Sequence, residues 1–435
     1  MWKWVPGVMV FLLLIASGCG EGSNVKKEGE NKMNTEDIAG EWRGAIQVPN
    51  QPLEIEVTFE KENGIKGSIT IPAQNVEGFS LTDIQLQEKQ LSFQMLISGQ
   101  SLNFSGVMEG DEIRGTFTQA GQSFPFNLKK SSGDHKSKQD EEEFMTIETD
   151  TGTLYGSIAL PEKGSIFPVA LIIPGSGPTD RNGNGPGGKN NSLKLLAEQL
   201  AAQGIASVRY DKRGAGKNAQ AVIPQKEIRF EQFVQDASRW MENLNNDGRF
   251  NKLAVIGHSQ GSLVGMAGAK EADVDAFISI AGAGRPIDQI LNDQLKDSLP
   301  EDAYQESLSI LNALRKGDTV PEVSNSLQSV FHPTVQPFLM SWMEYDPQEV
   351  IKSLDVPVLL VSGEHDIQVP VKDAELLKDA KPDAELLMIE KMNHVLKEAP
   401  EDREENLTTY GDPSKPLAEG LVPGIVEFLK ENGFN

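Results

Sequence analysis

The sequence predicts two folded parts of different class: an all-β, antiparallel, barrel-like domain, followed by an α/β domain whose mostly parallel sheet is flanked by helices. The first part contains about eight short β-type runs with no helical period between them, which is typical of an antiparallel barrel or sandwich. Beyond residue 143, β-type runs alternate with helical ones, which is typical of a parallel sheet covered on both faces. A chain of 435 residues is long enough for two or three domains.

The N-terminus has the features of an export signal. Residues 1–18 carry Lys3, an apolar stretch too short to span a membrane, and small residues immediately before Cys19. This segment resembles a bacterial lipoprotein signal peptide, which implies that Cys19 is lipidated and becomes the first mature residue. Cys19 is the only cysteine, so no intramolecular disulfide can form. We expect a protein anchored by lipid to the extracytoplasmic face of the cell membrane; a secreted protein with an ordinary signal is the alternative.

The charge of the chain limits its partners. Lysine and arginine total 40 against 64 aspartates and glutamates, which gives a formal net charge of −24. Such a charge repels nucleic acid and anionic lipid surfaces, so we expect no nucleic-acid partner and a membrane link through the lipid alone. Residues 19–34 contain almost nothing apolar, which is the composition of a disordered tether.

The β domain is expected over residues 35–130, and a polar, charged linker over residues 131–143. Turn signals such as Glu109-Gly110-Asp111 separate its strands. Such a domain can hold a small ligand, but its sequence contains no chemical motif, so we favour a spacer or docking platform. The expected strands are Trp42–Val48, Leu53–Glu60, Ile65–Ile71, Phe79–Leu86, Gln90–Ile97, Ser101–Met108, Glu112–Thr118 and Ser123–Leu128.

The α/β domain is expected over residues 144–435. Its alternation lapses between Gly284 and Leu354, where the pattern is largely helical, and we interpret this stretch as an inserted helical cap that overhangs the site. The expected strands are Leu154–Leu160, Val169–Pro174, Ala206–Tyr210, Leu253–Ile256, Ala276–Ala281, Val356–Val361 and Glu385–Ile389. The expected helices are Ser192–Gln203, Phe230–Leu244, Ser262–Lys270, Ile287–Leu295, Ala303–Leu314, Val320–Phe331, Val371–Asp379 and Ala418–Lys430.

A G-x-S-x-G motif, Gly257 to Gly261, lies between the apolar run Lys252–Ile256 and the helical segment that begins at Ser262. At such a sharp strand-to-helix turn the serine is exposed for attack, and small residues on either side let the strand and helix pass closely. With 41 glycines in the chain, the pentapeptide alone is weak evidence, because it arises by chance roughly 0.3 times in such a sequence. Its strand and helix context makes Ser259 the predicted nucleophile of a hydrolase.

An acidic loop and a histidine loop follow two later strands. Asp366 comes shortly after the run Val356–Val361, and His394 comes after the run Glu385–Ile389. Open α/β sheets bind ligands at the carboxyl edge, and the order serine, acid, histidine is that of folds with a nucleophile elbow. Of the five histidines, only His394 follows a strand in this way; the others lie in the linker, the elbow, the cap and beside the acid.

These three motifs resemble those of the α/β-hydrolase superfamily, and the resemblance covers about residues 144–435. Within that superfamily, the runs from Pro174 to Asn184 and from Tyr210 to Gly216 are similar to bacterial secreted esterases of the serine-aminopeptidase-like group, some of which also carry an N-terminal β domain.

The resemblance implies a role for each residue. Ser259 Oγ attacks the acyl carbon, His394 removes the serine proton and later protonates the leaving group, and Asp366 orients the imidazole. Glu364 and Asp373 are rivals for the acid, but Asp366 occupies the position of the family's acid, whereas Asp373 is expected in the first turn of the next helix.

The oxyanion hole is expected at the backbone N–H of Gln260, which follows the nucleophile, and, as the resemblance implies, at that of Ser176. The sequence shows no phosphate-binding glycine motif and no zinc-ligand spacing, so we expect neither a cofactor nor a metal. Asp180 and Arg181 are expected to pair within their loop.

We therefore expect a serine hydrolase that cleaves small to medium carboxylic esters through an acyl-enzyme. A serine-aminopeptidase-like peptidase or amidase is the alternative, because the same triad attacks amides. A second alternative is an envelope ligand-binding lipoprotein with an inert hydrolase fold, which the complete set of triad residues argues against. The cap and the loops, rather than the triad, select the substrate.

Overall fold

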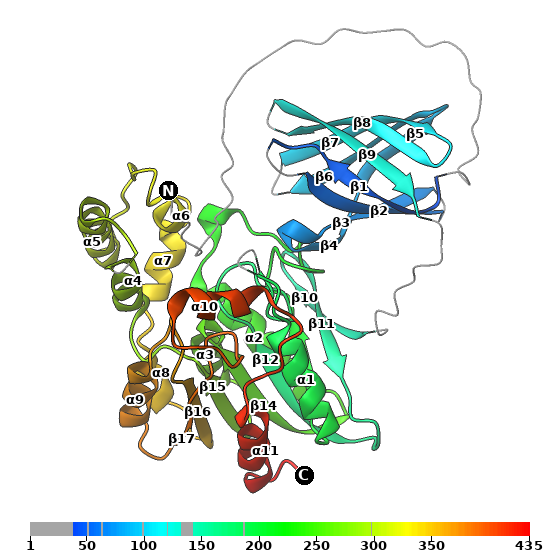
Figure 1. Cartoon of the computed structure of the whole chain (residues 1–435). Coiled ribbons are helices and arrows are strands. Elements are labelled where there is room, and N and C mark those ends of the chain that lie inside the picture. Colours follow the sequence, from blue (N-terminus) through cyan, green and yellow to red (C-terminus); the bar gives the residue numbers. More distant parts are fainter. Residues whose placement is uncertain are drawn as a thin grey trace. The chain divides into compact units, whose positions relative to one another are not determined.

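The computed structural model describes residues 38–49, 52–61, 64–97, 100–119, 121–131, 142–185, 188–296 and 298–435 (Figure 1). The predicted signal peptide, Cys19 and the tether lie outside these residues. The chain divides into two compact units. The β unit contains the described residues up to 131 together with Gly214–Val222, and the α/β unit contains Glu142–Arg213 and Ile223–Asn435. Every helix in the described part of the chain is too short or too polar to span a bilayer.

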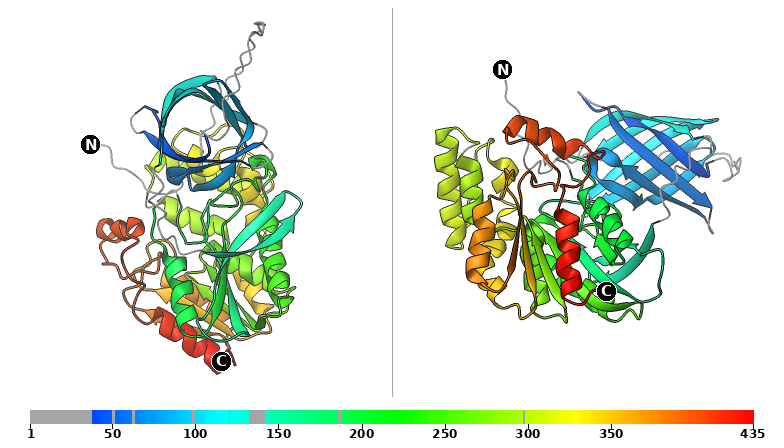
Figure 2. Two further views of the ribbon diagram at one scale, coloured as in Figure 1. Left: turned by 90° about the vertical axis from the view of Figure 1, so that its right-hand side faces the viewer. Right: turned by 60° about the horizontal axis from the view of Figure 1, so that its bottom comes forward.

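The β unit is one antiparallel sheet that curls into a nearly closed barrel, which the left view of Figure 2 shows almost along its axis. The strand order is β4-β3-β2-β1-β9-β8-β7-β6-β5. The backbone N–H of Leu81, between β4 and β5, donates to Gly67 O of β3 at 2.8 Å and draws the two ends of the sheet together. The strands are β1 Gly40–Ile46, β2 Leu53–Lys61, β3 Ile65–Ile71, β4 Val76–Ser80, β5 Thr82–Gln87, β6 Gln90–Ile97, β7 Gln100–Glu109, β8 Glu112–Gln119 and β9 Gln122–Lys130.

Aromatic side chains pack the interior of this barrel. Successive residues of a strand point to opposite faces, so every second residue faces inward. Phe93 and Phe104, on neighbouring strands, stack with ring centroids 4.6 Å apart, and Phe126 meets Phe104 edge-on at 5.3 Å. Trp42 is fully buried and its indole N–H donates to Ile38 O at 2.8 Å. The interior is therefore a packed core of apolar side chains.

One expected strand of the β unit is wrong. The run Phe79–Leu86 forms two strands, β4 and β5, instead of one. Leu81 turns inward at the junction and is buried, and Asp83 adopts a left-handed backbone with φ of 48°. The apolar positions change phase at this bend, from Phe79 and Leu81 before it to Ile84 and Leu86 after it, and the prediction of one continuous strand overlooked this change.

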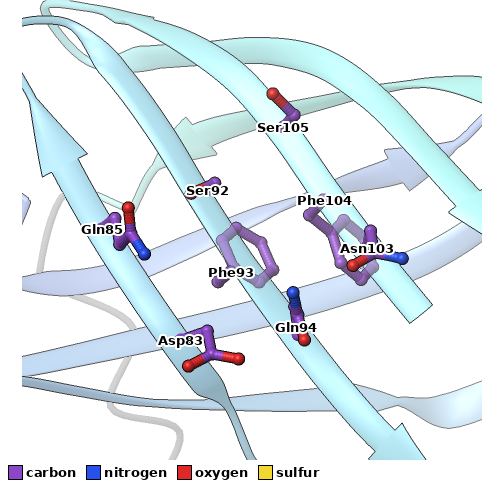
Figure 3. Close-up of a pocket in the computed structure, with 8 residues that line it drawn as sticks. All are labelled: Asp83, Gln85, Ser92, Phe93, Gln94, Asn103, Phe104 and Ser105. Carbon is purple, nitrogen blue, oxygen red and sulfur yellow. The ribbon is translucent and has the colours of Figure 1, made fainter. Parts of the chain in front are cut away.

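A cavity of about 490 Å³ lies on strands β5, β6 and β7 (Figure 3). Its polar lining residues are exposed or half-buried, whereas Phe93 and Phe104 belong to the packed interior. It is therefore a hollow in the outer wall of the barrel. The polar lining residues are Asp83, Gln85, Ser92, Gln94, Asn103 and Ser105.

The short segment Gly214–Val222 belongs to the β unit although it follows a strand of the α/β unit. The N–H of Gly216 donates to Asn75 O at 2.7 Å, and Gly216 O accepts from the N–H of Glu77 at 3.1 Å. Ala219 is buried among the core side chains of the barrel. The sequence carries no sign of this grouping, because nothing local distinguishes the segment from an ordinary loop.

The α/β unit is built on a sheet of order β10-β11-β13-β12-β14-β15-β16-β17. Only β11 runs antiparallel to its neighbours; all pairs from β13 to β17 are parallel. Strand β10 was not expected, because it follows directly on the charged linker sequence. The strands are β10 Glu143–Thr149, β11 Gly152–Ala159, β12 Phe167–Ile173, β13 Ala206–Tyr210, β14 Phe250–His258, β15 Ala276–Ile280, β16 Val358–Gly363 and β17 Glu385–Ile389.

Helices cover both faces of this sheet (Figure 1). Alternate residues of β14 face opposite sides of the sheet. Ala254 and Ile256 pack with α1 and α11 on one side, and Val255 faces Gly265 of α3 on the other. Helix α3 in turn contacts α2 and α8, and α8 contacts α9. The helices are α1 Ser192–Ala202, α2 Phe230–Asn245, α3 Gln260–Ala269, α8 Pro347–Lys352, α9 Val371–Ala380, α10 Arg403–Thr408 and α11 Leu421–Glu431.

The stretch between β15 and β16 contains helices and no strand among its described residues. Its helices share an apolar core of their own, which includes Ile310, Phe331 and Leu339. The expected helix Val320–Phe331 is too long: only its last turn is helical, and it follows a turn in which the N–H of Leu327 donates to Ser324 O at 2.9 Å. The inserted helices are α4 Ile287–Lys296, α5 Glu301–Arg315, α6 Gln328–Phe331 and α7 Gln336–Met343, followed by α8.

Candidate active site

Ser259 lies at the sharp turn between β14 and α3 and has the strained backbone of a nucleophile elbow. Its φ of 54° and ψ of −121° fall in a region that non-glycine residues rarely adopt. A Cβ on Gly257 would lie 2.4 Å from Gly261 O, and a Cβ on Gly261 would lie 2.3 Å from Ile173 O. Only glycine at both positions lets strand and helix approach this closely, and the N–H of Ser259 donates to Ile280 O at 2.9 Å.

His394 and Asp366 come from two separate loops and meet at hydrogen-bond distance. His394 Nδ1 lies 2.8 Å from Asp366 Oδ2, and both side chains are almost fully buried. The other carboxylate oxygen, Oδ1, accepts from the backbone N–H groups of Gln368 and Val369 at 2.8 and 2.9 Å. These donors fix the carboxylate in one orientation, so His394 Nδ1 carries the proton and Nε2 is free to act as a base.

The residue before the predicted nucleophile contacts the histidine loop. His258 Nε2 lies 2.8 Å from His394 O, and the two imidazole centroids are 5.0 Å apart. Burial, and then the nearby His394, lower the pKa of His258 to about 4, so its ring is neutral near pH 7. Because a carbonyl oxygen only accepts, the proton of neutral His258 is on Nε2. Among the described residues, no hydrogen bond joins Ser259 Oγ to His394, a contact that often tightens only when substrate binds.

Asn393 holds the histidine loop in shape. Its Oδ1 accepts from the backbone N–H groups of Val395 and Lys397 at 3.2 and 3.1 Å. Its Nδ2 donates to Asn406 Oδ1 at 3.0 Å and to Thr409 Oγ1 at 2.6 Å. Every one of these atoms is buried, so the bonds replace water and fix the backbone on both sides of His394.

The two predicted oxyanion donors belong to segments that meet at Ser259. Gln260 is the first residue of α3 and is buried. The peptide that ends in the N–H of Ser176 begins at Gly175, where a Cβ would lie 3.3 Å from Ser259 Cβ. Lys212, from the loop after β13, donates from Nζ to Gly175 O at 3.1 Å and to Gln260 Oε1 at 2.6 Å. The predicted donors therefore flank the serine.

Burial dominates the electrostatics of Lys212, which is only 6% exposed. Burial lowers the pKa of Lys212 to about 7, although the carboxylate of Asp236 acts in the opposite sense. The ammonium also lies 4.4 Å from the centroid of the Phe233 ring, whose face attracts a cation.

The two rival acids have other surroundings. Glu364 is exposed to solvent. Asp373 is fully buried in the first turn of α9, where its carboxylate accepts from Arg285 Nη2 at 2.8 Å and from the N–H of Gly284 at 3.0 Å. Asp373 therefore binds the start of the inserted helices.

The expected pairing of Asp180 with Arg181 is wrong. Arg181 pairs with Asp211 at 2.9 Å and with Glu142 at 2.8 Å. Asp180 instead accepts from the N–H groups of Asn182 and Asn184, both at 2.8 Å, and closes its own turn. The guanidinium reaches carboxylates that are distant in the sequence, which local reasoning cannot foresee.

Sequence reasoning missed three of the residues around the site: His258, Asn393 and Lys212. His258 and Asn393 lie next to predicted catalytic residues, and this adjacency is the only signal that the sequence offers for them. Lys212 lies in the run Tyr210 to Gly216 that resembles an esterase group, but nothing in the sequence indicated its contacts, because they join the loop after β13 to Gly175 and to the first residue of α3.

Parts of this chain are similar in sequence to known proteins. Residues 184–317 match the model of a family described as "Serine aminopeptidase, S33". The chain is 28% identical over 266 residues to Esterase EstD of Thermotoga maritima, a match that covers 59% of this chain and 61% of that protein. The chain thus spans less than two thirds of the length of that relative.

Solved structures are also similar. Est1E from Butyrivibrio proteoclasticus matches with a TM-score of 0.43 and 16% identity, over 66% of this chain and 98% of that one. The α/β hydrolase GrgF from Penicillium sp. sh18 matches with a TM-score of 0.45 and 20% identity, over 67% of this chain and 98% of that one.

The strand order, the single antiparallel strand β11 and the elbow after β14 agree with the family match. The α/β unit has the α/β-hydrolase fold, and it is preceded by an all-β, antiparallel, barrel-like unit.

Proposed function

We propose that this α/β-hydrolase unit is a serine carboxylesterase that cleaves small to medium acyl esters through Ser259, His394 and Asp366. The observation that carries the proposal is the 2.8 Å contact between His394 Nδ1 and Asp366 Oδ2. These two residues lie on the loops that follow β17 and β16 of the sheet that also contains β14. The similarity to an esterase supports ester hydrolysis as the reaction class.

In the proposed reaction, Ser259 Oγ attacks the acyl carbon while His394 Nε2 takes its proton. The bond between the acyl carbon and the alcohol oxygen then breaks, and His394 returns the proton to the leaving alcohol. A water molecule attacks the acyl-enzyme in the same way and releases the acid. The N–H groups of Gln260 and Ser176 stabilise the negative oxygen of each tetrahedral intermediate.

The test is a panel of p-nitrophenyl esters with acyl chains from two to twelve carbons, assayed with the purified protein. We expect hydrolysis of the shorter esters, and labelling of Ser259 by a fluorophosphonate, located by mass spectrometry. A protein that leaves every short-chain ester intact would not be the esterase proposed.

A peptidase or amidase is the second candidate, and the match to the serine aminopeptidase family favours it. The same serine attacks an amide, but the leaving amine needs protonation more than an alcohol does. Comparing kcat/KM for amino-acid p-nitroanilides and for p-nitrophenyl esters distinguishes the two candidate functions. A higher kcat/KM for the anilides would favour the peptidase or amidase over the esterase.

We further propose that the protein acts outside the cytoplasmic membrane, bound to it by lipid on Cys19. The support is the signal-like sequence that precedes this single cysteine. In the native host, Cys19→Ala is expected to move the protein from the membrane fraction to the soluble fraction. A protein that stays in the membrane fraction after this substitution is held there by something else.

A further inference from the structure

Among the described residues, Lys212 is the side chain that hydrogen-bonds to both segments expected to form the oxyanion hole: its Nζ lies 3.1 Å from Gly175 O and 2.6 Å from Gln260 Oε1. We propose that Lys212 is a positioning residue of the oxyanion hole, holding the Ser176 and Gln260 N–H groups in the orientation that stabilises the tetrahedral intermediate. The inference rests on the proposed esterase function and adds to it a residue that does not touch the reacting atoms.

The first contact acts through a planar peptide. Gly175 C=O and Ser176 N–H belong to one trans peptide unit, so the two groups point in opposite directions. When the Lys212 ammonium binds Gly175 O, it fixes the direction of the Ser176 N–H on the other side. A rotation of this peptide by half a turn would break the bond to Lys212 and turn the donor away from the intermediate. Glycine at position 175 makes such a rotation easy, so the peptide needs an external restraint.

The second contact acts on the residue that follows the nucleophile. Lysine has three donors and no acceptor, so the Gln260 carbonyl oxygen must be the atom that faces Lys212. The Gln260 Nε2 is buried and has no hydrogen-bond partner among the described residues, so the bond from Lys212 to Oε1 is the polar contact that holds this side chain. Because the backbone N–H of Gln260 is the other predicted donor, one ammonium restrains both halves of the oxyanion hole.

The chemistry of Lys212 agrees with such a role. A buried charge is unfavourable unless bonded groups surround it, and an apolar side chain of similar length would fill the space without that cost. The groups that face the ammonium are two neutral acceptors, the ring of Phe233 at 4.4 Å, and the more distant carboxylate of Asp236. Asp236 is itself paired with Arg213 at 2.6 Å, and in the described part of the chain no carboxylate forms an ion pair with Lys212. Its hydrogen bonds go to the oxyanion segments instead.

The test compares Lys212→Met with Lys212→Arg and with a matched control. Methionine keeps the length of the side chain and removes the donor, whereas arginine keeps a donor. We expect Lys212→Met to lower kcat by about tenfold to a hundredfold, less than the loss of an oxyanion donor itself, with KM changed less than about threefold. Lys212→Arg should recover part of this loss.

The inhibition constant of a trifluoromethyl ketone distinguishes a positioning role from a purely structural one, because a structural role alone would leave it unchanged. The adduct of the ketone with Ser259 carries a negative oxygen in the oxyanion hole, so the inhibition constant should rise by the same factor as kcat/KM falls. Lys381→Met is the control. Lys381 is also buried, but it pairs with Asp383 at 3.0 Å and precedes the edge strand β17, whereas Lys212 follows β13. This control should leave kcat and inhibition unchanged.

The outcomes separate the two proposals. An active wild type with Lys212→Met unchanged in kcat or in ketone inhibition overturns the positioning role alone. A wild type that neither hydrolyses esters nor reacts with a fluorophosphonate at Ser259 overturns the esterase proposal and this inference with it. If Lys212→Met does not fold, as judged by circular dichroism, Gln260→Met decides: it keeps the backbone N–H, removes the acceptor, and should show the same selective loss of kcat.

Discussion

The β unit and the α/β unit bury different kinds of side chain. The interior of the barrel is aromatic and aliphatic. Among the described residues of the β unit, Asn218 is the one polar residue that is buried. Asn218 comes from the segment Gly214–Val222, not from the barrel strands. The α/β unit, by contrast, buries charged groups such as Lys212 and Asp366.

This difference indicates where the chemistry lies. Burying an ionisable group is unfavourable unless partners surround it, so each buried charge has a fixed position, which is used in structure at Asp373 and, as proposed, in chemistry at Asp366. The barrel stabilises itself by apolar packing alone, which fits a structural part. In the α/β unit, the buried His394 and Asp366 face each other, and Lys212 contacts both segments that flank Ser259.

The largest expected effect is the loss of the nucleophile. Ser259→Ala should lower kcat by about 10⁴-fold or more, because the remaining residues cannot form an acyl-enzyme. The thermal unfolding midpoint should change little. Ser105→Ala, an exposed serine of the barrel, is the matched control and should retain the parental rate. Equal rates for Ser259→Ala and wild type would mean that the chemistry lies elsewhere.

The next effect concerns the acid. Asp366→Asn should lower kcat by about 10³- to 10⁴-fold, because an amide no longer favours the proton on His394 Nδ1. Steady-state kinetics with a short-chain aryl ester measure this. Glu364→Gln, two residues away and exposed, serves as the comparison and should retain most of the activity. A larger loss of kcat for Glu364→Gln than for Asp366→Asn would mean that Glu364, and not Asp366, is the acid of the triad.

A third prediction asks whether the barrel tolerates charge. Ala219 is 4% exposed within the barrel core, so Ala219→Asp should destabilise the β unit by about 3 kcal/mol, since the carboxylate finds no partner there. Hydrogen–deuterium exchange of peptides from β1 to β9, measured by mass spectrometry at increasing urea, reports on this unit. Gln220→Asp, the exposed neighbour, should have a much smaller effect; similar stability for both variants would show that the segment is loosely held.

The smallest effect is the contribution of His258 to the pH dependence of stability in the α/β unit. The pKa of His258 is about 4 in the folded protein, below the unfolded value of about 6.5, so its neutral form stabilises the fold above pH 6.5 and this contribution is lost as the pH falls toward 4. Its loss between pH 7.5 and 4.5 should cost about 2 to 3 kcal/mol.

Urea unfolding of the wild type and of His258→Asn at the two pH values measures this contribution. Asparagine keeps an N–H donor for His394 O but does not titrate, so its stability should fall less with pH. An identical pH dependence in both proteins would assign the effect to other groups.

The elbow and the two later loops were predictable because each depends on short-range rules. Gly257 and Gly261 are required by steric contact with the adjacent backbone, and a strand before and a helix after follow from hydrophobic period. The positions of Asp366 and His394 after two strands were visible for the same reason. Their catalytic roles remain predictions.

Other features depended on contacts between residues far apart in the chain. The division of one apolar run into β4 and β5 follows from the closure of the barrel between Leu81 and Gly67. The partners of Arg181 are Glu142, the residue before β10, and Asp211, and both are too far away in the sequence for a local pattern to predict the pairing.

The sequence by itself determined the two fold classes, the elbow at Ser259 and the order of the candidate triad, because strand and helix periods and the steric need for glycine act over a few residues. Only the tertiary structure decided that Gly214–Val222 joins the β unit and that Lys212 meets Gly175 and Gln260. Such contacts arise when segments that are far apart in the sequence converge at one edge of a sheet. No local sequence pattern predicts which side chain will be buried between them.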